Sequence, residues 1–302
     1  MRVLLMSNPS AGENGFDARD LTKLLESEGH AVIAQSVKED GWEDALSHDV
    51  DLVVAAGGDG TVAKVFKKLA GREKVATILP IGSANNIATS LGYEEDDQRR
   101  LVRDWPRAER RRFDIGSLRG DTSSLAFVES AGGGVFAEML VRADEIDSTP
   151  GGEAKVNLGL RLLLEIVTET PALEWTIQVD GVDVSGEFLA VEAMNTGLLG
   201  PNVPLAPAAD SSDRMLDLML VRTDDRAALA AHAKARLEQR SPPPLEIDVR
   251  RGRQIMLQPS PPTALHYDDD LVDQADGNRS FRVSVDSALD VLVPSADPSG
   301  ES

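Results

Sequence analysis

The stretch Asp51-Leu-Val-Val-Ala-Ala-Gly-Gly-Asp-Gly-Thr-Val62 decides how this chain folds. Its apolar residues predict a buried strand, and the glycines that follow them predict a sharp turn at the strand's end. From Val62 onward apolar residues recur at helical spacing, so a helix is expected directly after the turn. Glycine lets the backbone approach a ligand closely, and the first N–H groups of a helix attract anions. The stretch therefore predicts an anion-binding turn, although a tight turn without a ligand explains the same glycines.

An acidic residue, Asp59, stands in the middle of this turn. A carboxylate beside a bound anion needs a cation between the two negative groups. Magnesium bound to the phosphates of a nucleotide supplies such a cation. Asp59 is therefore the first candidate for a residue that orients a metal–phosphate group.

The first hundred residues alternate between predicted strands and predicted helices. The strands expected besides 52–57 are Arg2–Ser7, Ala31–Val37 and Val75–Pro80. Alternation of this kind predicts an α/β domain with a parallel, doubly wound sheet. Turn-rich loops at 8–15, 57–61 and 82–86 each follow a strand. Because ligands of such sheets bind outside the carboxyl ends of the strands, we expect the three loops to form one site.

The second half of the chain has many short strand patterns, and it predicts a β-rich, largely antiparallel domain. Single strands are expected over Ser124–Ala131 and Phe188–Met194. A helix is expected over Arg226–Arg240, with His232 on its solvent side. The predicted division is a nucleotide-binding domain over 1–120, a β-rich domain over 121–294 and a disordered tail over 295–302.

Composition limits the function. The chain has 302 residues, of which 41% are apolar, so it is long enough for two domains. A net charge of −20 argues against a nucleic-acid partner, whose phosphates it would repel. No apolar run is long enough to span a bilayer. The absence of cysteine excludes disulfides and thiolate sites. A cytoplasmic protein is expected.

Five motifs in order along the chain give a resemblance to a known family. They are Asn8-Pro-Ser-Ala-Gly12, Gly57-Gly-Asp-Gly-Thr-Val62, Leu79-Pro-Ile-Gly-Ser-Ala-Asn85, Phe113-Asp-Ile-Gly116, and Asn195-Thr-Gly with the later Asp213-Arg-Met-Leu-Asp217. Together they resemble the diacylglycerol kinase catalytic family, which includes bacterial lipid kinases and sphingosine kinases. The resemblance implies an N-terminal nucleotide-binding α/β domain and a C-terminal β-rich lid, with ATP and lipid meeting in the cleft between them.

The resemblance also implies roles for individual residues. Those implied to surround the ATP phosphates are Asn8, Ser10, Gly57, Gly58, Asp59, Gly60 and Thr61, with Thr61 also capping the helix. Those implied to form the second wall of the nucleotide site are Gly82, Ser83 and Asn85. Asp59 and Asp114 are implied to bind Mg²⁺, in part through water. Asn86 replaces an Asp that many bacterial members have. Arg214 replaces a usual Gly near a structural Mg²⁺, so this second ion is not expected here.

The family's catalytic base is the Asp of a late Asp-Gly-Glu. The best match is Asp276-Gly277-Asn278, so Asp276 is the expected base, together with Asp59 as the catalytic pair. A hairpin turn explains Asp276-Gly277 equally. Asp268 is a rival base because it also follows a strand, yet a solvated acidic face explains Asp268–Asp270 as well.

The resemblance predicts an ATP- and Mg²⁺-dependent lipid kinase that phosphorylates a diacylglycerol-like or sphingoid-like hydroxyl during transient contact with a membrane surface. Two alternatives stay open. One is a catalytically inactive nucleotide- or lipid-binding relative. The other is an NAD kinase, which shares Gly-Gly-Asp-Gly but would need an Asn-Glu pair where this chain has Asn85-Asn86. The sequence gives neither the lipid nor the oligomeric state.

Overall fold

The computed structural model describes residues 1–8, 18–93, 97–146, 150–273 and 280–295. The chain divides into two compact units, one of residues 1–113 with 287–302 and one of residues 114–286. Two long strands, β5 (Glu109–Arg119) and β19 (Phe281–Val293), each begin in one unit and end in the other. The last part of β19 therefore belongs to the unit in which the chain begins.

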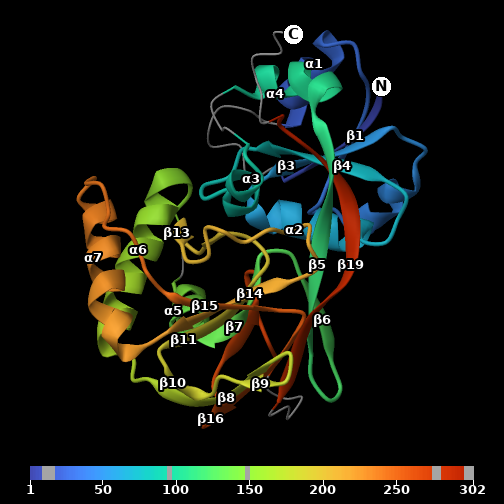
Figure 1. The fold of residues 1–302 in the computed structure, drawn as a ribbon. Helices are drawn as coiled ribbons and strands as arrows, with labels where there is room; N and C mark the ends of the chain where they lie inside the picture. The colour runs from blue at the N-terminus through green and yellow to red at the C-terminus, as the bar shows by residue number, and fades with distance from the viewer. Residues whose placement is uncertain (9–17, 94–96, 147–149, 274–279, 296–302) are drawn as a thin grey trace, which may run out of the picture. The chain divides into compact units, whose positions relative to one another are not determined.

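The first unit is an α/β domain with a parallel sheet, as predicted (Figure 1). Its strands lie in the order β4-β3-β1-β2, with the last part of β19 parallel to β4. The strands are β1 (Arg2–Ser7), β2 (Ala31–Ser36), β3 (Leu52–Gly57) and β4 (Val75–Pro80). Every residue of β3 is buried, because a central parallel strand is covered on both faces.

Helices connect these strands and cover the sheet. They are α1 (Ala18–Ser27), the 3₁₀ helix η2 (Trp42–Ser47), α2 (Asp59–Leu69), α3 (Asn86–Ser90), α4 (Gln98–Asp104) and the 3₁₀ helix η3 (Trp105–Arg107). Leucines of α1 pack with Trp105 and with alternate residues of β1 and β3 in one apolar cluster. Alternation along β1 places Leu4 and Met6 on the other face, where they are also fully buried.

The second unit is a β-rich antiparallel domain, also as predicted. One sheet has the order β15-β14-β11-β7-β17-β18, and β10-β8-β16 pairs with the first part of β19. The strands of the former are β7 (Ser130–Gly134), β11 (Ala190–Met194), β14 (Leu216–Val221), β15 (Asp248–Gly252), β17 (Leu265–Tyr267) and β18 (Asp270–Leu271). Those of the latter are β8 (Leu173–Val179), β10 (Gly186–Phe188) and β16 (Gln254–Ser260). Short pairs involve β6 (Ser124–Phe127), β9 (Val182–Asp183), β12 (Leu198–Leu199) and β13 (Val203–Pro204).

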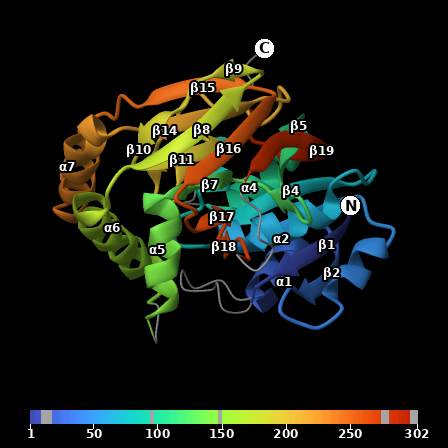
Figure 2. The same cartoon turned by 90° about the horizontal axis from the view of Figure 1, so that it is seen from below.

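Two apolar clusters hold this unit together. One contains Trp175 and Ile177 of β8 with Val191 of β11, so it lies between the two sheets. The other contains side chains of β11 and β14 together with those of α5 (Val135–Asp144), α6 (Gly152–Glu169) and α7 (Arg226–Leu237). The helices run beside one another along that sheet (Figure 2). The leucine-rich helix α6 therefore serves the core of the unit.

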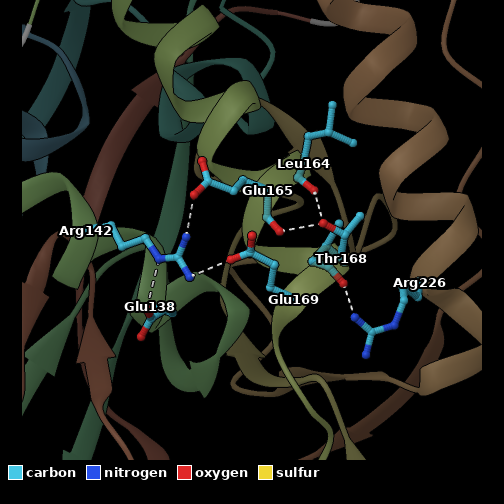
Figure 3. A network of polar contacts seen from close by, with 8 residues as sticks. Glu138, Arg142, Leu164, Glu165, Thr168, Glu169 and Arg226 are labelled. Atoms are coloured by element: carbon cyan, nitrogen blue, oxygen red, sulfur yellow. Dashed lines mark hydrogen bonds and ion pairs between the residues drawn. The ribbon is translucent and has the colours of Figure 1, made fainter.

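Polar contacts join the three helices at one end (Figure 3). The guanidinium of Arg142 on α5 contacts Glu138 of the same helix and Glu165 and Glu169 of α6, at 3.0, 2.9 and 3.3 Å. Arg226, the first residue of α7, donates to the carbonyls of Val167 and Thr170 at the end of α6. The last carbonyls of α6, which have no partner within the helix, thus gain charged donors.

Three sequence expectations need correction. The strand expected over Ser124–Ala131 is interrupted at Val128–Glu129, and that over Phe188–Met194 is interrupted at Leu189. His232 is only 2% exposed, because it faces the segment that follows α7, where its Nδ1 lies 3.0 Å from the carbonyl oxygen of Pro243.

Candidate functional site

The glycine turn at 57–60 joins β3 to α2 without a connecting loop. Gly57 ends β3, and α2 begins at Asp59 with Gly58 as its N-cap residue. A Cβ atom on Gly57 would lie 2.4 Å from Oγ1 of Thr61, so only glycine fits there. The strand therefore delivers the chain directly into the first turn of a helix, where backbone N–H groups attract anions.

A second turn follows the neighbouring strand β4. Asn85 has a left-handed backbone (φ 54°), and its amide accepts from the N–H of Gly82 at 3.0 Å and donates to the carbonyl of Gly82 at 2.9 Å. Asn85 is 2% exposed, whereas Ser83 between them is partly exposed. The side chain of Asn85 thus closes the turn and leaves Ser83 at its outer side.

The two turns are in direct contact. A Cβ atom on Gly82 would lie 2.2 Å from Cα of Gly58, and the N–H of Ile81 donates to the carbonyl of Gly57 at 3.2 Å. One carboxylate oxygen of Asp59 accepts from the N–H of Ile87 in the first turn of α3, at 2.9 Å. Only glycine fits at 82 in a backbone contact this close, and a Cβ atom on Gly58 would lie 3.1 Å from Cα of Gly82, which also favours glycine there.

The third predicted loop begins at the same edge. Ser7 pairs with Ala56 in the parallel register of β1 and β3, so Asn8 follows β1 at the level of Gly57. Asn8 is partly exposed. Ser10 lies outside the described residues. The described residues of the three predicted loops therefore lie at the carboxyl ends of β1, β3 and β4.

Thr61 differs from the expectation. Gly58, and not Thr61, is the N-cap residue of α2. The N–H of Thr61 already donates to the carbonyl of Gly58 at 2.9 Å, and the residue is 5% exposed. The helix begins three residues earlier than expected, because Gly58 in an extended conformation can start it without a side-chain cap.

Magnesium fits this site only through other ligands. Within the described residues, no three acidic or histidine side chains are grouped closely enough to hold a metal ion. Mg²⁺ in nucleotide enzymes usually retains water and phosphate ligands beside one or two carboxylates, and Asp59 suits that arrangement. Asp114 is fully buried in the second unit, where its carboxylate accepts from the N–H of Arg214 at 2.6 Å. Arg214 itself has φ 64°, the conformation in which glycine is common.

Of the two candidate bases, only Asp268 lies within the described residues. Asp276 lies outside the described residues. Asp268 is 7% exposed, so the solvated acidic face expected for Asp268–Asp270 is wrong at its first position and holds for Asp269 and Asp270. The carboxylate of Asp268 accepts from the N–H groups of Val128 (2.9 and 3.1 Å) and Glu129 (2.8 Å). Asp268 thereby binds the two backbone N–H groups of the segment that interrupts the strand between β6 and β7.

Sequence reasoning missed several buried polar residues. Asn195 is 1% exposed, and its Nδ2 donates to the carbonyls of Asp114 (2.9 Å) and Val128 (2.8 Å). Glu192 and His266 form a buried pair in the second unit. The Asn-Thr-Gly motif had singled out Asn195 without giving it a role, whereas the spacing of Glu192 and His266 gave no signal, because they meet only across the sheet.

Comparison with known proteins identifies the family. The sequence model of the diacylglycerol kinase catalytic domain matches residues 2–118. That of the YegS C-terminal NAD kinase beta sandwich-like domain matches residues 130–293, more than half of the chain. The chain belongs to the diacylglycerol kinase family. Family membership makes it a phosphotransferase with an alcohol group as acceptor.

Relatives of this kinase-family chain are moderately similar. The diacylglycerol kinase of Bacillus subtilis is 27% identical over 73% of this chain and 74% of its own length. A probable lipid kinase YegS-like of Stenotrophomonas maltophilia is 28% identical over 72% of each. Among solved structures, a putative diacylglycerol kinase from Bacillus anthracis has a TM-score of 0.70 at 19% identity, covering 98% of this chain and 97% of its own. A yeast NADH kinase has a TM-score of 0.53 at 10% identity, covering 98% and 84%. Both structures show the likeness in fold.

No helix in the described parts of this kinase-family chain combines the length and apolar character needed to cross a membrane.

Proposed function

We propose that this protein transfers the γ-phosphate of ATP to the hydroxyl of a lipid that resembles diacylglycerol or a sphingoid base. The observation that carries the proposal is the contact between the glycine turns of β3 and β4, joined by Asp59 and the N–H of Ile87. In a member of the diacylglycerol kinase family, this contact supplies a rigid frame of backbone N–H groups for phosphates.

The proposed nucleotide site divides between backbone and side chains. Backbone N–H groups at the turn after β3 and at the start of α2 bind the phosphates, helped by the hydroxyl of Ser83 and the side chains of Asn8 and Ser10. Asn85 positions the second turn through its two bonds to Gly82. Because phosphoryl transfer depends mainly on positioning and neutralisation of charge, a rigid turn serves it well.

Asp59 and Asp114 are the proposed magnesium-binding residues, acting largely through water and phosphate oxygens. Magnesium supplies positive charge that neutralises the phosphates during transfer. The bond from the Ile87 N–H fixes one carboxylate oxygen of Asp59 and leaves the carboxylate charge in place.

We propose Asp276 as the base that takes the proton from the lipid hydroxyl. Asp268 is the weaker candidate, because its carboxylate accepts from two backbone N–H groups. Replacing each residue by Asn separates the two candidates. The variant that lacks the base should lose phosphoryl transfer and still bind ATP. Asp268→Asn is also expected to lower the stability of the fold, because the Asp268 carboxylate binds backbone N–H groups.

The test is transfer from labelled ATP to a panel of lipids in mixed vesicles with Mg²⁺. Wild-type protein should label at least one lipid, Asp59→Ala and Asp276→Ala should not, and Glu73→Gln, an exposed acidic position of the first unit, should label like wild type. Absence of labelling on every lipid, with the three variants indistinguishable from wild type, would reject the proposal. Vesicle sedimentation in the same samples tests the proposed transient contact with a membrane surface.

One observation favours a second candidate function, a relative that binds nucleotide or lipid without turnover. Asn86 and Asn278 stand where the family commonly has acids, and Arg214 takes a left-handed backbone where the family commonly has Gly. Calorimetry that shows ATP binding to a protein without transfer activity would support this candidate. Phosphorylation of NAD in the same assay would support an NAD kinase, for which the described turn offers Asn85-Asn86 in place of Asn-Glu.

A further inference from the structure

A buried charged pair crosses the middle of the sheet in the second unit. Glu192 on β11 and His266 on β17 are 0% and 2% exposed, and His266 Nε2 lies 3.0 Å from both carboxylate oxygens. The two strands flank β7, and both residues are in register with Gly132 of that strand. A Cβ atom on Gly132 would lie 2.4 Å from Glu192 Oε2 and 2.1 Å from the carbonyl oxygen of Val191. Glu192 and His266 therefore meet across Gly132 of β7, where the absence of a side chain leaves room for their contact.

Stability alone does not explain a pair in this place. Removing two charged groups from water costs several kcal/mol each, and apolar residues of similar volume often serve a core at least as well. Burial alone would lower the pKa of His266, but the adjacent Glu192 carboxylate raises it to about 9. The imidazole is therefore protonated at neutral pH, and both ring nitrogens act as donors.

The second ring nitrogen of His266 continues the contact away from the pair. Nδ1 lies 2.9 Å from the carbonyl oxygen of Asp268, so protonated His266 holds the backbone of a residue with a left-handed conformation (φ 50°). The carboxylate of Asp268 in turn accepts from the N–H groups of Val128 and Glu129. Hydrogen bonds through His266 and Asp268 thus link the charged pair to the interruption between β6 and β7.

Asn195 carries the network from this break to Asp114. Its N–H donates to the carbonyl of Glu129 at 2.9 Å, and its Nδ2 bridges the carbonyls of Val128 and Asp114. Glu192, His266, Asp268 and Asp114 are thereby joined through hydrogen bonds that all lie within the second unit. Because each of these residues is less than a tenth exposed, solvent cannot readily replace a lost contact.

We propose that Glu192 and His266 are positioning residues that hold the Asp268 turn, and through it Asp114, in the single conformation that phosphoryl transfer requires. The catalytic part of this inference rests on the function proposed above. The positioning part concerns the backbone of residues 128–129 and can be measured without any substrate.

The experiment replaces the charged pair by apolar residues. The paired variant Glu192→Leu/His266→Leu is compared with wild type and with Val191→Ala, a fully buried neighbour on the opposite face of β11 that lies outside the network. Hydrogen exchange of peptides that span residues 127–131 is measured by mass spectrometry, together with the melting temperature and the kinetics of lipid phosphorylation. His266→Gln is a second variant, which keeps polar atoms at the site if the apolar pair fails to fold.

The expected result for the paired variant is exchange at least tenfold faster at 128–129, with little change in the other strands. Its kcat should fall at least tenfold at an unchanged KM for ATP. Val191→Ala should raise exchange throughout the sheet in proportion to its lost stability and leave kcat unchanged.

Two outcomes would overturn the positioning role. One is that residues 128–129 exchange at the wild-type rate in both the paired variant and His266→Gln. The other is that their exchange rate rises no more selectively than it does in Val191→Ala. If exchange rises selectively at 128–129 in the paired variant while kcat stays at the wild-type value, the positioning role holds and its proposed effect on catalysis is overturned. If wild-type protein phosphorylates no lipid, the proposed function fails and the exchange measurement still decides the positioning role.

Discussion

The carboxylate of Asp59 accepts a hydrogen bond from the backbone N–H of Ile87, with 2.9 Å between Oδ1 and N. The bond joins the first turn of α2 to the first turn of α3, which follow neighbouring strands. Asp59 therefore has two separable properties: an acceptor that holds two turns together, and a negative charge available to a metal–phosphate group.

Asp59→Asn separates these properties, because its amide oxygen can still accept from Ile87 while the charge is lost. We expect the free energy of unfolding to stay within about 1 kcal/mol of wild type and phosphoryl transfer to fall roughly 100-fold or more. Asp59→Ala should lose the activity and, in addition, about 1–3 kcal/mol of stability, because the Ile87 N–H loses its acceptor. Urea denaturation and the labelled-ATP assay measure the two effects. Full activity of Asp59→Asn would contradict the role of its charge.

Gly82→Ala tests the contact between the two glycine turns. The added methyl group would lie 2.2 Å from Cα of Gly58, so the turns must separate. We expect calorimetry with a non-hydrolysable ATP analogue to show affinity lowered about tenfold or more. Gly71→Ala is the matched control, because nothing lies within 4 Å of its added methyl group, although its φ of 73° makes the substitution costly by about 1–2 kcal/mol. Equal affinity in the two variants would show that stability, and not the turn contact, governs binding.

Tyr93→Phe tests the attachment of the end of β19 to the first unit. The buried Tyr93 hydroxyl bonds to the hydroxyl of Thr77 on β4 (3.0 Å) and to the carbonyl of Leu292 on β19. Burial raises the pKa of Tyr93 to about 12, so the hydroxyl remains a donor at neutral pH. Its loss should cost about 1–2 kcal/mol. A double-mutant cycle with Thr77→Val should show coupling of about 0.5–1.5 kcal/mol, and additive effects would contradict the bridging role.

The charged state of His266 predicts a pH dependence of stability. In the described part of the chain, the charged groups that raise its pKa to about 9 are Glu192 of β11 and Asp268 of its own turn. The proton is bound more tightly in the folded than in the unfolded chain, whose histidine has a pKa near 6.5. The stabilisation is therefore complete below about pH 6.5 and is lost as the pH rises through about 9, by about 3 kcal/mol at most.

Urea denaturation at pH 6, 7.5 and 9 measures this loss. Wild-type protein should become progressively less stable across the series, whereas His266→Gln should show a flatter profile because its side chain does not titrate. A wild-type profile as flat as that of the variant would contradict a protonated His266 in the folded chain.

The local patterns of the sequence were sufficient for the fold class and for the turn at the end of β3. An apolar run that ends in glycines and is followed by helical spacing specifies strand, turn and helix with residues adjacent in the chain. The same holds for β4 and its turn. Parallel strands then bring their carboxyl ends to one edge, which is why turns distant in sequence could be expected to meet.

What the tertiary structure alone decided depends on residues far apart in the chain. The break at Val128–Glu129 could not be predicted, because its N–H groups are bound by Asp268, 140 residues away from Val128. Glu192 and His266 have no informative spacing, and their contact exists only because β11 and β17 flank a glycine of β7 in a particular register. Local hydrogen-bonding preferences are set by neighbours along the chain and are therefore visible in the sequence. Burial of a charge, and the partner that compensates for it, is set by strand register and packing, which the sequence specifies only once the whole sheet has formed.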